Sequence, residues 1–220
     1  TARSRGLGDV YKRQEFVPTF KKEEENYKEA AKILKESGAD LLVLEMLLDV
    51  DHSKILLNAA LETGLPVWVG LSCCDSKFDN SVIGRNFRAE KEKSLIYDEN
   101  KYKDQPKYLP EDNIILLEDI IKSLTSLGGD VYGIMHTWFQ DSIGGLKILK
   151  NNWKGPIMFY PEIHKFDTNT HKAIITMTEE EFSNSILELI DDQIQIVGGC
   201  CGVNDKHLKR LIQSISKQIN

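Results

Sequence analysis

The chain has 220 residues, of which 41% are hydrophobic and 28% charged, and its formal net charge is -6. This composition predicts a soluble globular protein with one sizeable core. The acidic balance argues against a nucleic-acid partner or an anionic membrane surface, because both require a basic face. No apolar run approaches the roughly 18 residues of a membrane span. Four cysteines in two adjacent pairs do not match a secreted disulfide framework, so we expect a reduced, cytoplasmic protein.

Residues 1–14, TARSRGLGDVYKRQ, differ from the sequence that follows them. They show no helical or strand periodicity, and they carry four basic residues in an acidic chain. They resemble translated adapter sequence, and the alternative is a disordered native tail. We therefore predict a non-native or disordered tail over residues 1–14 and a single domain over residues 15–220.

From there the sequence repeats one unit: an amphipathic helix, a glycine and a short apolar strand. In the first unit Tyr27, Ala30, Ala31 and Leu34 fall on one helical face. The glycines that are expected to end the helices are Gly38, Gly64, Gly128 and Gly155. The five predicted strands cover residues 41–45, 67–72, 131–135, 157–160 and 194–198.

Two further signals define the last part of the chain. Thr178 and Glu181 have the spacing of a capping box, in which each residue bonds the backbone of the other. A final helix is predicted over about Asp205 to Ile219.

The pattern predicts an α/β fold built on a parallel sheet. The strands are apolar nearly throughout, as is typical of parallel strands that are buried on both faces. Alternating helices and strands allow a doubly wound fold or a barrel. No glycine-rich phosphate loop follows the first strand, which disfavours dinucleotide binding. A barrel requires eight strands and the sequence shows five.

Residues 75–112 break this rhythm with a long polar segment after the second predicted strand. A loop of this length inside a compact domain is usually a lid, a binding loop or a disordered segment. It leaves the carboxyl end of a strand, where α/β folds place their sites. The alternative is a solvated insertion without a function.

The stretch IQIVGGCCGVNDKHLKRL, residues 194–211, contains the clearest chemical signal. Successive side chains on a strand point to opposite faces, so Cys200 and Cys201 can share a target only where the backbone leaves strand geometry. The flanking glycines permit this departure. Two thiolates suit zinc, and His136 lies at the carboxyl end of the third predicted strand, at the same edge of the sheet. A set of two cysteines and one histidine leaves a fourth position open for a substrate.

Other cysteines and histidines are weaker candidates. Cys73 and Cys74 also follow a strand, but small buried cysteines are common in protein cores. His207 and His52 lie in the first turns of helices, where a local structural role is expected. The remaining two, His164 and His171, fall in a predicted loop without cysteine neighbours. The alternative for His136 is a hydrogen-bonded histidine that binds no metal.

The sequence GGCCG, followed by a helix that contains a histidine, resembles the homocysteine S-methyltransferase family. The segments GADLLVLEM, GLPVWVGLS and GPIMFYPE resemble the family in the same order, so the likeness covers about residues 25–220. The resemblance implies a TIM barrel with zinc held by three cysteines at the carboxyl ends of the strands. Two of these would be Cys200 and Cys201. The third corresponds to His136, in a GIMH sequence where the family has GINC, and some members have MHT there.

The resemblance also implies substrate contacts. Glu45 falls where the family has an ET motif that holds the amino-acid substrate, and Met46 replaces the threonine. The alternative for Glu45 is a carboxylate in a salt bridge at the barrel rim. The family's YPN strand end becomes Tyr160, Pro161 and Glu162, so Glu162 is a second departure.

The implied activity is zinc-dependent transfer of a methyl group from an onium-type donor to the thiol of homocysteine, giving methionine. The likeness begins just before the family's fourth strand, so we expect the C-terminal five-eighths of a barrel, inactive alone because open sheet edges are unstable. Two alternatives are a non-catalytic zinc-binding homologue and a methyltransferase with another thiol acceptor. The oligomeric state is left open.

Overall fold

The computed structural model describes residues 18–75, 81–85, 114–166 and 173–219. Its elements, in chain order, are α2 (Phe20–Glu36), β1 (Leu42–Leu47), α3 (Val50–Leu61), β2 (Val67–Leu71), β3 (Cys74–Asp75), β4 (Val82–Arg85), β5 (Ile114–Leu116), α5 (Leu117–Thr125), β6 (Val131–Trp138), α6 (Phe139–Asn152), β7 (Ile157–Glu162), β8 (His164–Phe166), β9 (Ala173–Ile175), α7 (Glu179–Leu189), β10 (Ile194–Val197) and α8 (Asp205–Ile219). None of the helices in these ranges is long and apolar enough to cross a membrane.

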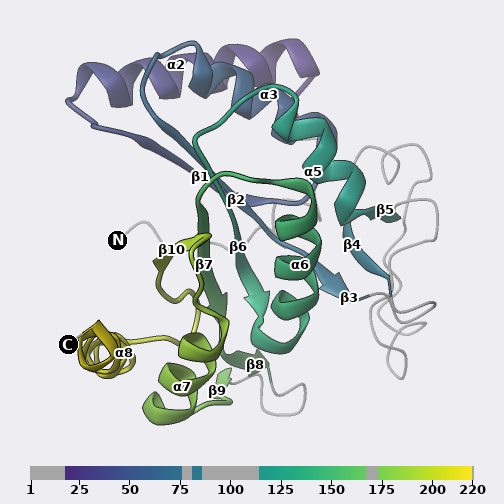
Figure 1. The fold of residues 1–220 in the computed structure, drawn as a ribbon. Coiled ribbons are helices and arrows are strands. Elements are labelled where there is room, and N and C mark those ends of the chain that lie inside the picture. The colour runs from purple at the N-terminus through teal and green to yellow at the C-terminus, as the bar shows by residue number, and fades with distance from the viewer. Residues whose placement is uncertain (1–17, 76–80, 86–113, 167–172, 220) are drawn as a thin grey trace.

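The five predicted strands form one parallel sheet, in the order β1-β2-β6-β7-β10 (Figure 1). The helices pack against one another in sequence order: α2 on α3, α3 on α5, α5 on α6, and α7 on α8. The rings of Phe139 in α6 and Phe182 in α7 complete the row, with centroids 6.4 Å apart. A single row of helices along the sheet is the arrangement of a barrel wall, whereas a doubly wound fold divides its helices between two faces. The architecture is a partial TIM barrel of five strands.

Alternation along the strands explains where the core lies. Leu44, Val69 and Tyr132 occupy neighbouring register positions and are buried on the side of the helices. On the opposite face Val43 is 42% exposed, and Glu45 on the same side is also exposed. In a closed barrel this second face would be the packed interior.

Glycines end the helices, and side-chain caps begin them, largely as the sequence predicts. Gly38, Gly64 and Gly128 all have positive φ angles, which glycine adopts without a Cβ clash. The capping box at the start of α7 is present, with Thr178 and Glu181 bonding in both directions. The sequence predicts that Gly155 ends this helix. In the structure α6 ends earlier, at Asn152, and the backbone is already extended at the next residue.

Two predictions need correction. The polar segment over residues 75–112 contains a short strand, β4, which pairs antiparallel with β3 and β5. Val82 and Ile83 of this strand are buried, so apolar packing orders it; residues 76–80 and 86–112 lie outside the described ranges. The helical face predicted in α2 is only partly buried. Ala31 is buried but Leu34 is 51% exposed, because α2 lies at the end of the helical row and packs mainly on α3.

Candidate metal centre

The carboxyl ends of β6, β7 and β10 meet at one edge of the sheet, since the three strands are parallel neighbours. His136 lies in β6, Glu162 ends β7, and Cys200 and Cys201 follow β10. The parallel topology therefore brings together side chains that are up to 65 residues apart in the sequence.

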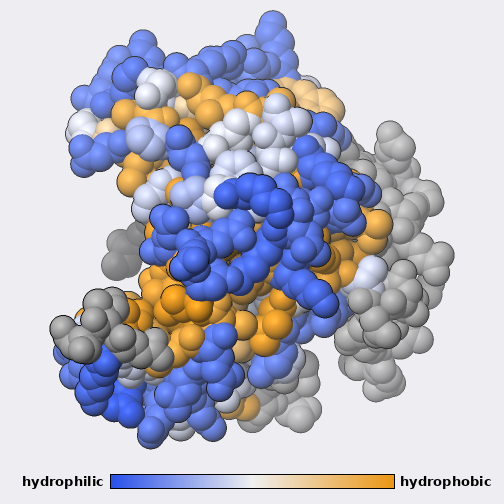
Figure 2. Space-filling model, viewed as in Figure 1, coloured by the Kyte–Doolittle hydropathy of each residue, from blue (hydrophilic) through white to orange (hydrophobic). Residues whose placement is uncertain are grey.

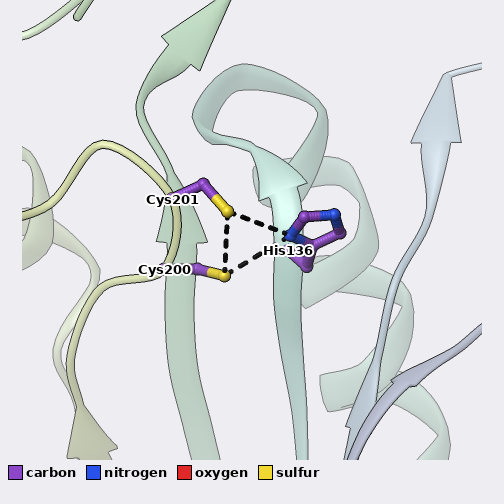
Figure 3. Close-up of side chains that lie close together, drawn as sticks. All are labelled: His136, Cys200 and Cys201. Atoms are coloured by element: carbon purple, nitrogen blue, oxygen red, sulfur yellow. Dashed lines mark hydrogen bonds between the residues drawn. The ribbon is translucent and has the colours of Figure 1, made fainter. Parts of the chain in front are cut away.

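The backbone at this edge is strained at two positions. His136 has φ 43° and Met46, near the end of β1, has φ 61°. They are the two non-glycine residues with positive φ among the described ranges. Such left-handed conformations are uncommon outside glycine and concentrate at functional sites. The strain turns the His136 ring away from the regular strand alternation and toward the loop that follows β10 (Figure 3).

Glycines and backbone hydrogen bonds shape the cysteine loop. Gly202 has φ 89°, and a Cβ on Gly199 would lie 2.3 Å from Cγ1 of Val203. The loop is fixed to β7 and the residues after it, because the amide of Cys200 donates to the carbonyl of Pro161 at 3.0 Å. The carbonyl of Cys201 accepts from the amide of Ile163 at 2.9 Å. This departure from strand geometry turns two adjacent side chains toward one point.

The three predicted side chains converge (Figure 3). Nδ1 of His136 lies 3.5 Å from Sγ of Cys200 and 3.5 Å from Sγ of Cys201, and the two sulfurs are 3.9 Å apart. With Zn–S bonds of about 2.3 Å and Zn–N bonds of about 2.0–2.1 Å, a regular tetrahedron has edges of about 3.8 Å between sulfurs and about 3.6 Å between sulfur and nitrogen. The donor set and its spacing thus fit three corners of a zinc site.

Burial disfavours the charged form of the Cys200 thiol. Desolvation raises the pKa of the Cys200 thiol to about 12, and the neighbouring charges of Cys201 and Glu162 act in the same direction. A thiolate in this position is unfavourable in the metal-free protein. A divalent ion bound here would supply the missing positive charge, and its binding would be coupled to loss of the thiol proton.

A second group of possible ligands adjoins the first. Glu162, His164 and Cys201 offer donor atoms that all lie within 4.8 Å of one another. Oε2 of Glu162 is 3.3 Å from Nδ1 of His136 and 3.8 Å from Nδ1 of His164. The prediction that His164 has no cysteine neighbour was wrong. The sequence does contain a signal for this contact. Glu162 and His164 are two positions apart at the end of a strand, and residues with that spacing point to the same side.

Glu45 lies on the open face of β1 and is exposed. The salt bridge considered as its alternative role is not seen among the described residues. Burial raises the pKa of Tyr160 above its usual range, and the charges of Glu45 and then Cys200 add to the effect. Tyr160 thus lies within electrostatic reach of both the carboxylate and the cysteine pair.

The remaining candidates are away from the centre. Cys73 is buried against the helical layer, as expected for a core cysteine, and none of the four cysteines forms a disulfide. His207 is buried, with Nδ1 2.9 Å from Oδ1 of Asn204, so its role is structural. His52 pairs with the buried Glu23. His171 lies outside the described residues.

Comparisons with known proteins agree with this architecture. Among solved structures, the homocysteine methyltransferase MmuM from Escherichia coli is similar in its metallated form, with a TM-score of 0.60 and 14% identity over 94% of this chain and 56% of that one. Its apo form gives a TM-score of 0.58 and 14% identity over 90% and 59%. Dihydrodipicolinate synthase DapA-2 from Bacillus anthracis gives 0.50 and 11% identity over 86% and 53%.

These identities establish a shared fold, and the chain spans less than three-fifths of the length of either MmuM structure. No curated protein matches the chain. The sequence family described as Homocysteine S-methyltransferase matches residues 3–95 and 116–215, which is most of the chain. The chain therefore belongs to the homocysteine S-methyltransferase family.

Proposed function

We propose that this chain contributes the zinc-binding part of an enzyme that transfers a methyl group from an onium-type donor to the thiol of homocysteine, giving methionine. His136, Cys200 and Cys201 are the proposed ligands, and a fourth position receives the thiol. The observation that carries the proposal is the spacing of their donor atoms, 3.5, 3.5 and 3.9 Å, on three separate backbone positions.

The chemistry follows from the thiol. A free thiol has a pKa near 8.5, so at neutral pH it is mostly protonated and a poor nucleophile. Zinc bound in this centre would stabilise the thiolate form of the substrate and so supply a nucleophile at neutral pH. Replacing a third thiolate by the neutral imidazole of His136 leaves the ligand set less negative, which favours binding of another anionic sulfur.

Other residues of the chain would orient the substrate. Glu45, on the open face of β1, is the proposed partner of the substrate ammonium group, because an exposed carboxylate at a strand end can accept its hydrogen bonds. The charges of Glu45 and Cys200 both raise the pKa of Tyr160, so Tyr160 is a further residue that the substrate would contact in this proposal.

We further propose that the isolated chain has little activity. β1 and β10 are the two outer strands of the five-stranded sheet, and each pairs on one side only within the described sheet. Figure 2 shows apolar side chains gathered beside β7 and β10, next to α7 and α8. Unpaired parallel edges and exposed apolar surface destabilise an open barrel wall.

The test has two parts. The metal content of the purified chain is measured first, with the variant Cys200→Ser as the control that should lose zinc. Methyl transfer to homocysteine is then assayed with sulfonium, betaine and methylfolate donors. Zinc in the wild-type chain and none in the variant support the centre. Absence of zinc from a folded wild-type chain would refute it.

The assay also separates the alternatives. Zinc binding without methyl transfer, in a longer protein that contains this chain, would favour a non-catalytic zinc-binding homologue. Transfer to a different thiol would favour another acceptor. Robust turnover of homocysteine by the isolated 220 residues would contradict the proposed inactivity of the chain on its own.

A further inference from the structure

Tyr160 in β7 has a buried hydroxyl group without a hydrogen-bond partner in the protein. Its oxygen, Oη, is buried and makes no hydrogen bond with any residue in the described ranges. Most buried polar side-chain atoms of native proteins have a partner, and a buried hydroxyl without one is unfavourable. The group therefore has an unused capacity to donate and to accept a hydrogen bond.

A second buried tyrosine shows the usual arrangement. Tyr132 in β6 lies on the helical side of the sheet, and its hydroxyl donates to the carbonyl of Gly128 at 2.6 Å. A tyrosine hydroxyl of this protein can thus find a partner when it is buried for packing alone. On the neighbouring strand, the hydroxyl of Tyr160 has none among the described residues, which points to a partner from outside the chain.

Strand alternation and a glycine place this hydroxyl on the open face of the sheet. Phe159 is buried on the side of the helices, so Tyr160 points to the opposite face, which also carries Glu45. Across this face the ring reaches β2, because a Cβ on Gly70 would lie 2.8 Å from Oη of Tyr160. The same Cβ would lie 3.1 Å from the carbonyl oxygen of Leu44 in β1. The absence of a side chain at Gly70 therefore lets the hydroxyl approach the strand that carries Glu45.

The two groups whose charges act on this hydroxyl are both acidic. After burial itself, the charges of Glu45 and Cys200 raise the pKa of Tyr160. Such surroundings disfavour a further anion and favour a cation. A protonated hydroxyl can accept an N–H bond from a cation and still offer its own proton to a carboxylate. Among the groups of an amino-acid substrate, the ammonium fits this position best.

We propose that the hydroxyl of Tyr160 is a second acceptor for the ammonium group of the substrate, beside the carboxylate of Glu45. This inference rests on the proposed function and deepens it, because it makes the amino group of the acceptor thiol a feature that the site selects. An ammonium group carries several N–H donors, so it can bond a hydroxyl as well as a carboxylate. A thiol without the amino group would leave the buried hydroxyl unpaired, and sites of this kind discriminate strongly against such analogues.

The first test needs no substrate. The variants Tyr160→Phe and Tyr132→Phe each lose one hydroxyl and keep the ring, and urea unfolding compares both with the wild-type chain. Tyr160→Phe should have a urea midpoint at least as high as the wild type, because it removes a buried group that has no partner. Tyr132→Phe should have a lower midpoint, because the carbonyl of Gly128 loses its donor.

The second test measures binding of homocysteine to the zinc-loaded chain by calorimetry. Tyr160→Phe should bind homocysteine about 10- to 100-fold more weakly, since a hydrogen bond to a charged group is lost. Tyr132→Phe should match the wild type. The analogue 3-mercaptopropylamine, which lacks the carboxylate, should show the same loss in Tyr160→Phe. The analogue 4-mercaptobutyrate, which lacks the amino group, should bind the wild type and Tyr160→Phe equally.

Three results would overturn the inference while leaving the proposed function in place. A urea midpoint that falls as far in Tyr160→Phe as in Tyr132→Phe would mean that the protein itself satisfies the hydroxyl. Unchanged homocysteine affinity in Tyr160→Phe would remove the contact, and a loss that follows the carboxylate of the ligand would exclude the ammonium as its partner. Failure of the wild-type chain to bind zinc, or to bind homocysteine once loaded, would instead refute the proposed function.

Discussion

The chain contains the same dipeptide, Cys-Cys, at the ends of two strands, and the two pairs have different environments. Cys73 is buried, and its amide donates to Oγ1 of Thr137 at 3.0 Å. Cys74 begins β3 and pairs with Ile83 of β4. The backbone there continues into a strand, where adjacent side chains are expected to point to opposite faces. Cys200 and Cys201 are on a glycine loop, and their sulfurs lie 3.9 Å apart.

The difference teaches that the backbone around two cysteines, more than their adjacency, decides whether they can act together. After β2 the chain enters a small antiparallel sheet, which enforces alternation of side chains. After β10 the positive φ of Gly202 lets the chain turn instead. One pair therefore contributes to packing, and the other is positioned to share a ligand.

Cysteine substitutions test this contrast with the largest expected effect. Replacing Cys200 or Cys201 with serine should lower zinc affinity by at least about 100-fold, because a thiolate ligand is lost. The matched Cys73→Ser variant should keep the zinc affinity of the wild type and lose stability, since a hydroxyl is placed in an apolar site. Chelator competition and urea unfolding measure the two quantities. Equal loss of zinc affinity in all three variants would remove the distinction.

Glycine substitutions test the same difference between the two cysteine pairs by changing the backbone or the packing beside each pair. Gly202→Ala places a side chain at φ 89°, which costs about 1–3 kcal/mol, and should move the sulfurs and weaken zinc binding. Gly145→Ala would put a Cβ 2.6 Å from Sγ of Cys73. It should cost about 1–3 kcal/mol of stability by overpacking and leave zinc affinity unchanged. The same two measurements apply, and a loss of zinc affinity in Gly145→Ala would contradict the separation of the two regions.

The narrowest test concerns one thiol, through a pH dependence of stability at Cys73 whose effect per pH unit is small. Burial raises the pKa of this thiol in the folded protein to about 12, from an ordinary value of 9.0. The folded state therefore holds a proton that the unfolded state releases above about pH 9, and the associated stability is lost as the pH rises from about 9 to about 12. The slope attributable to this group is at most about 1.4 kcal/mol per pH unit.

Comparing wild type with Cys73→Ala isolates that slope. Urea unfolding at several alkaline pH values should show a shallower loss of stability in the variant, even though its stability at pH 8 is lower. Identical slopes in the two proteins would indicate that the thiol is accessible to water in the folded state.

Much of the fold could be predicted from the sequence, because its signals are local and repeated. Continuous apolar runs bounded by glycine locate the five strands of the sheet within two or three residues, as the end of the last strand at Val197 and the start of the first at Leu42 illustrate. The final helix has the predicted bounds, Asp205–Ile219. The small sheets were missed, since β4 has only four residues and finds its partner, β5, about thirty residues further along the chain.

The convergence of His136 with the cysteine pair could also be predicted, since parallel strands bring their carboxyl ends to one edge. The left-handed backbone of His136 could not, because nothing in the sequence marks a histidine for that conformation. His164 was missed because its strand, β8, has only three residues and was read as a loop. The role of these residues as zinc ligands stays a prediction.

X-ray absorption at the zinc edge tests the central claim most directly. The account predicts one zinc ion per chain, with two sulfur neighbours at about 2.3 Å and nitrogen or oxygen neighbours at about 2.0–2.2 Å. Addition of homocysteine should raise the sulfur count from two to three. A zinc ion surrounded only by nitrogen and oxygen, or a sulfur count that homocysteine does not change, would contradict the account.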